Sequence, residues 1–251
     1  MTAPDGKAPP PQGPLVPLAL FAFAADVLVY YFTIDPLGDW SQASFGHRSW
    51  GILAHYGLRA ASALLFAFAL VHWRALSPRD FGLSPAGFRQ DAAWTLRLIA
   101  VLAGLSLVFI GLAVASCRLF DIDLNQWAFY ETDRRQGGGW SGYLWSAVVA
   151  APLVEELVYR SLLTPALRAG YGDRGAIVAG AALFYVLHLV YGQPFWMVHY
   201  LVAGAILTWA YLQRGKLWIC VLLHAGGNLL VVLDDALRDF APDVFRAIIG
   251  R

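Results

Sequence analysis

Charged side chains are scarce in this chain. Only 14% of its 251 residues are charged, whereas 59% are hydrophobic, and the mean hydropathy is +0.56. A soluble domain carries about 25% charged residues, so this chain has too few to cover its own surface. The shortage excludes a water-soluble globular domain and predicts that most of the surface faces the lipid bilayer. The ten Trp and eleven Tyr suit the two membrane interfaces.

Three further shortages narrow the fold and the function. The net charge of +1 offers no electrostatic basis for a nucleic-acid partner. The two cysteines, Cys117 and Cys220, lie apart in apolar stretches and form neither a disulfide framework nor a metal-binding pair. Period-2 alternation of apolar and polar residues is absent, and in lipid only helices and closed barrels satisfy the backbone. The sequence therefore predicts an all-α protein.

Long apolar runs take the place of the missing charges. A helix that spans a bilayer needs about 20 mostly apolar residues. Seven stretches come close to this length: 15–34, 51–73, 93–117, 141–166, 175–192, 196–213 and 216–234. We therefore expect a polytopic bundle of about seven transmembrane helices.

The two ends of the chain differ from these runs. Residues 1–14 are rich in proline, which is typical of a disordered tail. Residues 236–251 alternate charged and apolar side chains, as an interfacial amphipathic helix does. We expect neither end to span the membrane.

The charges of the connecting segments predict the orientation. The connection after the second run carries Arg74 and Arg79, and the turn after the sixth carries Arg214 and Lys216. The segment 118–140, on the other side, is rich in Asp and Glu. The positive-inside rule then places the N-terminus in the cytoplasm and the C-terminus outside. The short chain, rich in Ala and Gly, suggests a bacterial inner membrane.

Polar residues interrupt the C-terminal apolar runs at a regular spacing. A charged side chain at this depth costs about 2.5–3.5 kcal/mol on insertion scales, so such residues normally serve a function. Residues four apart share a face of a helix. Three pairs have this spacing: Glu156 with Arg160, Phe184 with His188, and His224 with Asn228. Together they predict a site in a buried polar cavity of the bundle.

The adjacent glutamates are suited to different roles. Glu155 lies about 100° around the helix from Glu156. Arg160 can therefore pair with Glu156, which leaves Glu155 free for proton transfer. Structural interpretations stay open. The first pair can be an ion pair near a helix end, and His224 and Asn228 can join helices by hydrogen bonds.

The N-terminal half also contains polar residues within its apolar runs. Asp26 lies in the first run, and His55 and Arg59, four residues apart, lie in the second. Two interpretations remain open. These side chains pair across helices, or they line an access path to the site.

The three motifs together resemble a known family. Glu155-Glu156-x-x-x-Arg160, Phe184-x-x-x-His188 and His224-x-x-x-Asn228, in this order on successive helices, are similar to the CAAX protease and bacteriocin-processing family. This family, also called CPBP or Abi, includes the type II CAAX prenyl endopeptidase. The resemblance covers residues 141–235 as a catalytic helical core. Residues 15–140 would be a variable transmembrane region.

The resemblance implies an intramembrane endopeptidase. Glu155 and His188 would activate a water, and His224 and Asn228 would stabilise the oxyanion. The remaining motif residues would organise the site or line it: Glu156, Arg160 and Phe184. The substrate would be a membrane-associated peptide or protein with a prenylated CAAX-like, bacteriocin-like or C-terminal sorting-tail sequence.

The sequence leaves alternatives open for metal dependence and for catalysis. The chain has no His-Glu-x-x-His run of the zinc type, so we expect no metal cofactor. Two carboxylates and two imidazoles nevertheless leave a zinc site open. The competing function is a non-catalytic membrane immunity or scaffold protein that keeps the helical core. The complete set of motif residues favours the enzyme, and the absence of two similar halves disfavours a transporter.

Overall fold

Almost all of the part of the chain that the structure describes is helical. The computed structural model describes residues 15–45, 48–72, 81–84, 87–120, 139–191, 199–241 and 243, and none of them forms a strand. The prediction of an all-α fold is therefore confirmed. Five helices stand alone: α1 (Leu15–Phe45), α2 (Ser49–His72), α3 (Phe88–Leu119), α8 (His199–Arg214) and α9 (Leu217–Phe240).

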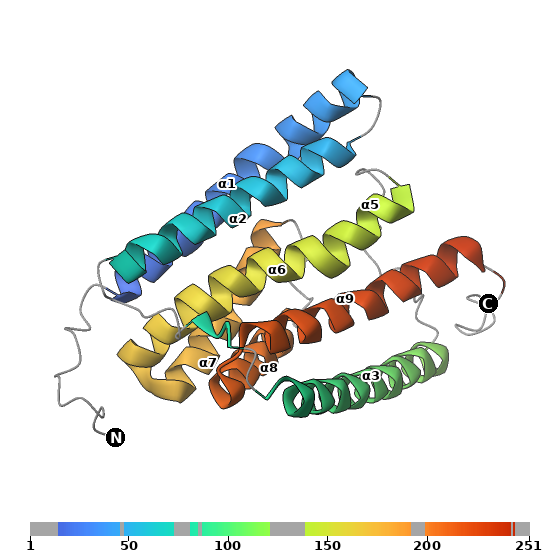
Figure 1. The fold of residues 1–251 in the computed structure, drawn as a ribbon. Helices are drawn as coiled ribbons and strands as arrows, with labels where there is room; N and C mark the ends of the chain where they lie inside the picture. The colour runs from blue at the N-terminus through green and yellow to red at the C-terminus, as the bar shows by residue number, and fades with distance from the viewer. Residues whose placement is uncertain are drawn as a thin grey trace.

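A continuous series of helical segments lies between α3 and α8. It consists of α5 (Gly139–Trp145), a π-helical stretch (Ser146–Ala150), α6 (Ala151–Glu156), a second π-helical stretch (Leu157–Leu163) and α7 (Thr164–Val190) (Figure 1). The series bends at Gly172, whose φ of 68° and ψ of −179° are readily adopted only by glycine. Gly172 thus separates a first limb, residues 139–171, from a second limb, residues 173–190.

The structure does not confirm the predicted count of seven spans. Among the described residues, four helical stretches are long and apolar enough to cross a membrane: Leu15–Ser44, Trp50–Ala69, Trp140–Val190 and Leu217–Leu237. They mark the chain as an integral membrane protein, but a count of seven is not confirmed. The predicted spans 141–166 and 175–192 are the two limbs of one bent helical series. Helix α8 has 16 residues, or about 24 Å at 1.5 Å per residue, which is shorter than a bilayer core of about 30 Å.

Helix boundaries also differ from the apolar runs. Helix α1 continues to Phe45, beyond the predicted end at 34, and contains Pro36. Arg48, just before α2, lies 3.4 Å from both Asp35 and Asp39. These ion pairs link the polar end of α1 to the start of α2, and α1 continues beyond the end of its apolar run.

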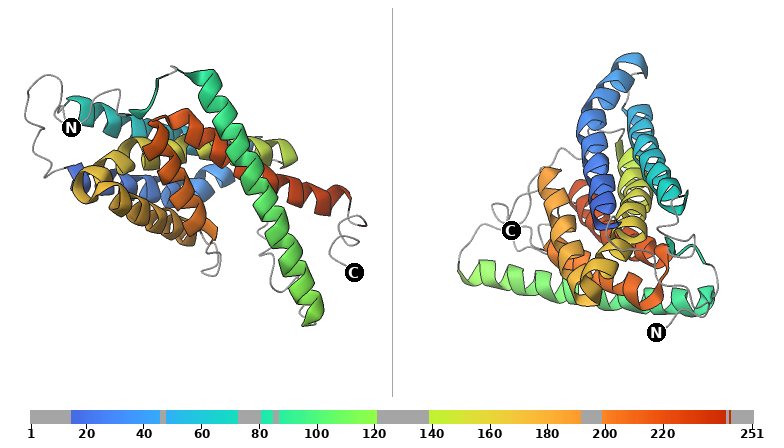
Figure 2. Two further views of the ribbon diagram at one scale, coloured as in Figure 1. Left: turned by 90° about the horizontal axis from the view of Figure 1, so that it is seen from below. Right: turned by 90° about the vertical axis from the view of Figure 1, so that its left-hand side faces the viewer.

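The first limb lies at the centre of the bundle. Helices α1 and α2 form an antiparallel hairpin that packs against this limb, and α9 runs along another side of it (Figure 1). Helix α3 packs against α9 and crosses the other helices at a steep angle (Figure 2). The second π-helical stretch is almost entirely buried, with Val158, Leu162 and Leu163 at most 1% exposed. The glutamate pair that precedes it is therefore placed deep in the protein.

Helices α7 and α8 approach closely through small residues. A Cβ atom on Gly204 would lie 2.9 Å from Cβ of Phe184, and one on Gly180 would lie 2.7 Å from Oγ1 of Thr208. Glycine at such contacts lets helix backbones approach within membranes. The approach positions Phe184, and with it His188 one turn later.

Polar contacts show which connections share a side of the bundle. Lys216 donates a hydrogen bond to Asp91, and Arg214 Nη1 lies 3.5 Å from the same carboxylate. The start of α3 and the turn between α8 and α9 therefore lie together, as the alternation of basic connections predicts. At the opposite side, the Tyr143 hydroxyl donates to Asp235 at 2.6 Å. Which side faces the cytoplasm stays a prediction.

Some predicted segments lie outside the described residues. They are the tail 1–14, the connection that carries Arg74 and Arg79, most of the acidic segment 118–140, and 242 with 244–251 of the C-terminal segment. Helix α9 continues to Phe240, so residues 236–240 of the predicted amphipathic segment belong to it. The domain boundaries stay predictions.

Candidate active site

Two π-helical stretches flank the glutamate pair. Glu155 and Glu156 end α6, between the stretches Ser146–Ala150 and Leu157–Leu163. The Thr164 hydroxyl donates to the carbonyl of Tyr159, five residues earlier, at 2.8 Å. π-helical turns are frequent at functional sites because the extra residue per turn redirects side chains. Apolar periodicity did not reveal these stretches.

Glu156 is the centre of a buried three-residue contact. One oxygen, Oε2, lies 3.1 Å from Nε of Arg160, one helical turn later, and the other accepts a hydrogen bond from His224 Nδ1 at 2.8 Å. Glu156 and Arg160 are both 0% exposed. The guanidinium of Arg160 also lies over the rings of Tyr159 and Phe184. The ion pair expected from the spacing is present, and it also holds His224 from α9.

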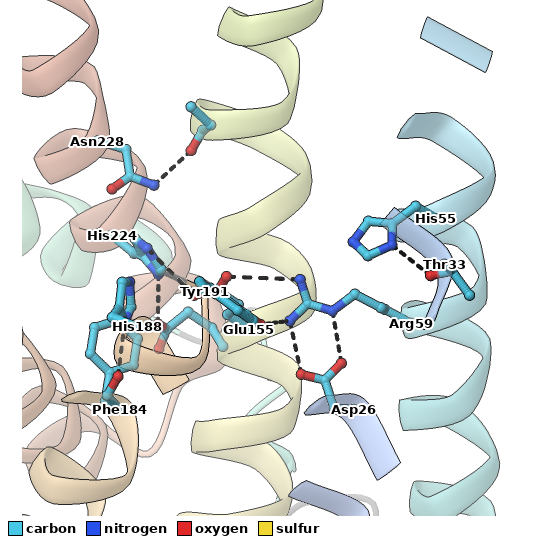
Figure 3. A network of polar contacts seen from close by, with 12 residues as sticks. Asp26, Thr33, His55, Arg59, Glu155, Phe184, His188, Tyr191, His224 and Asn228 are labelled. Carbon is cyan, nitrogen blue, oxygen red and sulfur yellow. Dashed lines mark hydrogen bonds and ion pairs between the residues drawn. The ribbon is translucent and has the colours of Figure 1, made fainter. Parts of the chain in front are cut away.

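Glu155 lies between two cationic or basic groups without a direct hydrogen bond to either. Its Oε1 is 3.9 Å from Arg59 Nη1, and its Oε2 is 4.0 Å from His224 Nε2 (Figure 3). Both separations exceed hydrogen-bond length, and separations of this size are commonly bridged by water. Glu155 is therefore close to charged partners while its oxygens remain available to a small polar molecule.

His188 and His224 lie around one aromatic ring. The Phe184 ring centroid is 4.6 Å from that of His188 and 5.7 Å from that of His224 (Figure 3). Since a carbonyl only accepts, His188 Nδ1 donates its hydrogen to the Phe184 oxygen at 2.8 Å, which leaves Nε2 as the acceptor of a neutral ring. The His188 ring also stacks on Tyr200 at 3.8 Å. The imidazoles therefore belong to one cluster.

Asn228 joins α9 to the first limb. Its Nδ2 donates to the carbonyl of Ala147 at 2.7 Å, within the first π-helical stretch. This contact uses one of the two amide hydrogens. Asn228 therefore joins two helices by a hydrogen bond, which is one of the interpretations that the sequence left open. It also lies one helical turn after His224.

The sequence left open whether Asp26, His55 and Arg59 pair across helices or line an access path, and in the structure the residue that brings the N-terminal hairpin to the site is Arg59. Its guanidinium donates to both oxygens of Asp26, at 2.9 and 2.8 Å, and to the Tyr191 hydroxyl at 2.7 Å. Asp26 and Arg59 do pair across helices, whereas His55 contacts Thr33 at 2.7 Å. The only sequence signal for Arg59 was a cation within an apolar run.

The donor groups of the site do not form a metal cluster. Among the described residues, no three His, Cys, Asp or Glu side chains are grouped so that they could hold a metal ion. A metal ion beside Glu156 would need His224 Nδ1 as a ligand. This nitrogen instead forms a hydrogen bond with the Glu156 carboxylate. Metal independence itself stays a prediction.

Comparisons with known proteins relate the central helices to one family. Residues 138–230 match the sequence model of the family described as Rce1-like, type II CAAX prenyl endopeptidase. The match contains all the motif residues from Glu155 to Asn228, but neither Asp26 nor Arg59. The chain is also 28% identical over 144 residues to the thiol:disulfide interchange protein DsbD of Haemophilus influenzae (strain 86-028NP). That similarity covers 54% of this chain and 24% of DsbD, so the chain spans about a quarter of the relative's length.

No solved structure matches the chain at a significant level. The family match instead rests on the segment that contains both limbs, α8 and most of α9. Residues 138–230 are therefore similar to the Rce1-like family of type II CAAX prenyl endopeptidases, as the resemblance of the three motifs predicted.

Proposed function

We propose that this protein is an intramembrane endopeptidase that hydrolyses a peptide bond of a membrane-associated substrate. The observation that supports the proposal is the grouping of His188 and His224 around Phe184, with Glu155 4.0 Å from His224. The family match supports the same class of reaction. A prenylated CAAX-like, bacteriocin-like or C-terminal sorting-tail sequence is the proposed substrate.

The charges of the cluster suit proton transfer. It contains three carboxylates and two guanidinium groups: Asp26, Glu155 and Glu156, with Arg59 and Arg160. The carboxylates therefore outnumber the guanidinium groups by one. Because an uncompensated charge in a low-dielectric interior is costly, a proton that Glu155 takes from the attacking water offsets the excess charge.

The proposed reaction uses these groups in sequence. Glu155 removes a proton from a water oriented by His188 Nε2, and the water oxygen attacks the scissile carbonyl. His224, held through Nδ1 by Glu156, directs Nε2–H toward the developing oxyanion, and the second amide hydrogen of Asn228 adds to this stabilisation. Glu155 then passes the proton to the leaving nitrogen as the carbon–nitrogen bond breaks.

A comparison of protein termini tests the function. We expect membrane-associated proteins to acquire new termini in cells that express the wild-type chain and not in cells that express Glu155→Gln. Mass spectrometry of protein termini measures this difference and identifies the cleavage site. Identical termini in the two cultures, with no cleavage of a farnesylated CAAX peptide, a bacteriocin precursor or a sorting-tail peptide by folded protein, would support a non-catalytic scaffold.

We propose that the reaction needs no metal ion. Glu156 and the Phe184 carbonyl orient the two imidazoles through their Nδ1 atoms, so a metal is not required to position them. Activity is expected to survive exhaustive chelation of the purified protein, with less than one zinc per chain by elemental analysis. Stoichiometric zinc, with activity lost on chelation and restored by zinc alone, would contradict this. Glu155 would then act beside a metal-bound water.

A further inference from the structure

One guanidinium from outside the matched domain lies against the proposed base. Arg59, in α2, is 0% exposed. Three hydrogen bonds to two neighbours fix its orientation: Asp26 of α1 accepts from Nε and Nη2, and Tyr191 accepts a second hydrogen bond from Nη2. The guanidinium carbon also lies 5.4 and 5.7 Å from the ring centroids of Tyr30 and Tyr56. A bidentate pair of this kind has little rotational freedom.

The remaining nitrogen of Arg59 is directed at Glu155. Nη1 is buried without a hydrogen-bond partner among the described residues, and it lies 3.9 Å from Oε1 of Glu155 (Figure 3). Buried donors normally have a partner, so this nitrogen is suited to a water or substrate atom that also contacts Glu155. If Arg59 served only to join α1 to α2, its ion pair with Asp26 would suffice, and Nη1 would not need to lie beside Glu155.

We propose that the hairpin α1–α2 is part of the active site, with Arg59 as the positioning residue of Glu155. This inference rests on the proposed function. The groups facing Glu155 are Arg59 of α2, His224 of α9 and the neighbouring Glu156, with Asp26 behind Arg59. Glu156 and Asp26 disfavour a second negative charge here, whereas the guanidinium favours one. Arg59 therefore places a positive charge 3.9 Å from Oε1 of Glu155, which favours the form of the carboxylate that accepts a proton from water.

The first test removes the charge while preserving the pair. Asp26→Asn with Arg59→Gln replaces the ion pair by two neutral amides, so neither partner is left as an unpaired buried charge. We expect kcat for cleavage of a farnesylated, internally quenched CAAX peptide to fall about tenfold or more, since a general base contributes about 10²- to 10⁴-fold. KM should change little. Arg59→Lys, with Asp26 unchanged, should cleave the peptide faster than the double variant because it keeps a positive charge beside Glu155.

The matched control is Arg48→Gln. Arg48 lies beside the same hairpin and pairs with carboxylates at 3.4 Å, but these carboxylates are exposed, whereas Asp26 is buried. Its kcat and KM are expected to equal those of the wild type. If the double variant cleaves the peptide as fast as this control, the inference is overturned.

A second measurement separates this inference from the proposed function. Dicyclohexylcarbodiimide, an apolar reagent, modifies protonated carboxyl groups within membranes, and mass spectrometry with a Glu155→Gln reference assigns the labelled residue. At neutral pH, Glu155 should be labelled several-fold faster in the double variant than in the wild type or Arg48→Gln. If no probe peptide is cleaved by the wild type, the proposed function fails, and faster labelling still supports the placement of Arg59. Equal labelling overturns the inference whether or not the protein is a peptidase.

Discussion

Glu155→Gln is expected to lower kcat by at least about 10²-fold, because an amide cannot take the proton of the attacking water. The free energy of unfolding in detergent should change little. Glu155 is 3.9 and 4.0 Å from its charged neighbours, so the substitution breaks no direct hydrogen bond. Cleavage rate and thermal unfolding, measured on the same preparation, check both parts.

His188→Ala provides the companion measurement. It removes the imidazole that would orient the water and should lower kcat to a similar degree. It also removes a stack on Tyr200, which is worth about 0.5–1.5 kcal/mol, so a small loss of stability accompanies it. Full activity in Glu155→Gln would remove this carboxylate from the role of base.

Glu156→Ala and Arg160→Ala are expected to lower the free energy of unfolding by about 3–5 kcal/mol, because each leaves an uncompensated buried charge. Both side chains are 0% exposed and 3.1 Å apart. Cleavage should be impaired as well, since Glu156 orients His224. Chemical or thermal unfolding in detergent, together with the cleavage assay, measures the two effects.

Arg168→Ala is the control for this prediction. Arg168 pairs with Asp173 at 2.7 Å, but both side chains are more than half exposed. Exposed pairs contribute at most about 1 kcal/mol, so the control should unfold nearly as the wild type does. Wild-type stability in Glu156→Ala would show that the buried pair is dispensable. Equal instability of Glu155→Ala, His188→Ala, Glu156→Ala and Arg160→Ala would favour a structural role for the whole cluster.

The apolar runs predicted membrane helices, whereas a count of seven spans is not confirmed. Composition alone requires helices in lipid, and the described residues are helical accordingly. The helices differ in extent from the apolar runs at polar contacts and at one glycine with a positive φ angle. Arg48 holds the polar end of α1, and Gly172 bends one series of segments that hydropathy divides into two spans. These features depend on contacts or backbone angles that hydropathy does not encode.

Within the candidate site, local spacing predicted what a single helix determines. Glu156 and Arg160 are one turn apart, and so are Phe184 and His188, whose contacts the structure contains. The bond from His224 to Glu156 was not foreseen, because it joins residues 68 positions apart. The π-helical stretches around α6 were missed for a related reason. Their extra residue per turn is stabilised by surrounding packing rather than by a pattern of residue types.

The sequence by itself determined that this is a helical membrane protein with an Rce1-like set of polar motifs, because burial in lipid and helical periodicity are local properties. Only the tertiary structure decided which partners these residues have. It placed Arg59 of the N-terminal hairpin 3.9 Å from Glu155 and directed His224 to Glu156. A buried charge is stabilised by whichever opposite charge or donor the packing brings near it. That choice depends on how the helices pack, and the spacing of residues along one helix does not specify it.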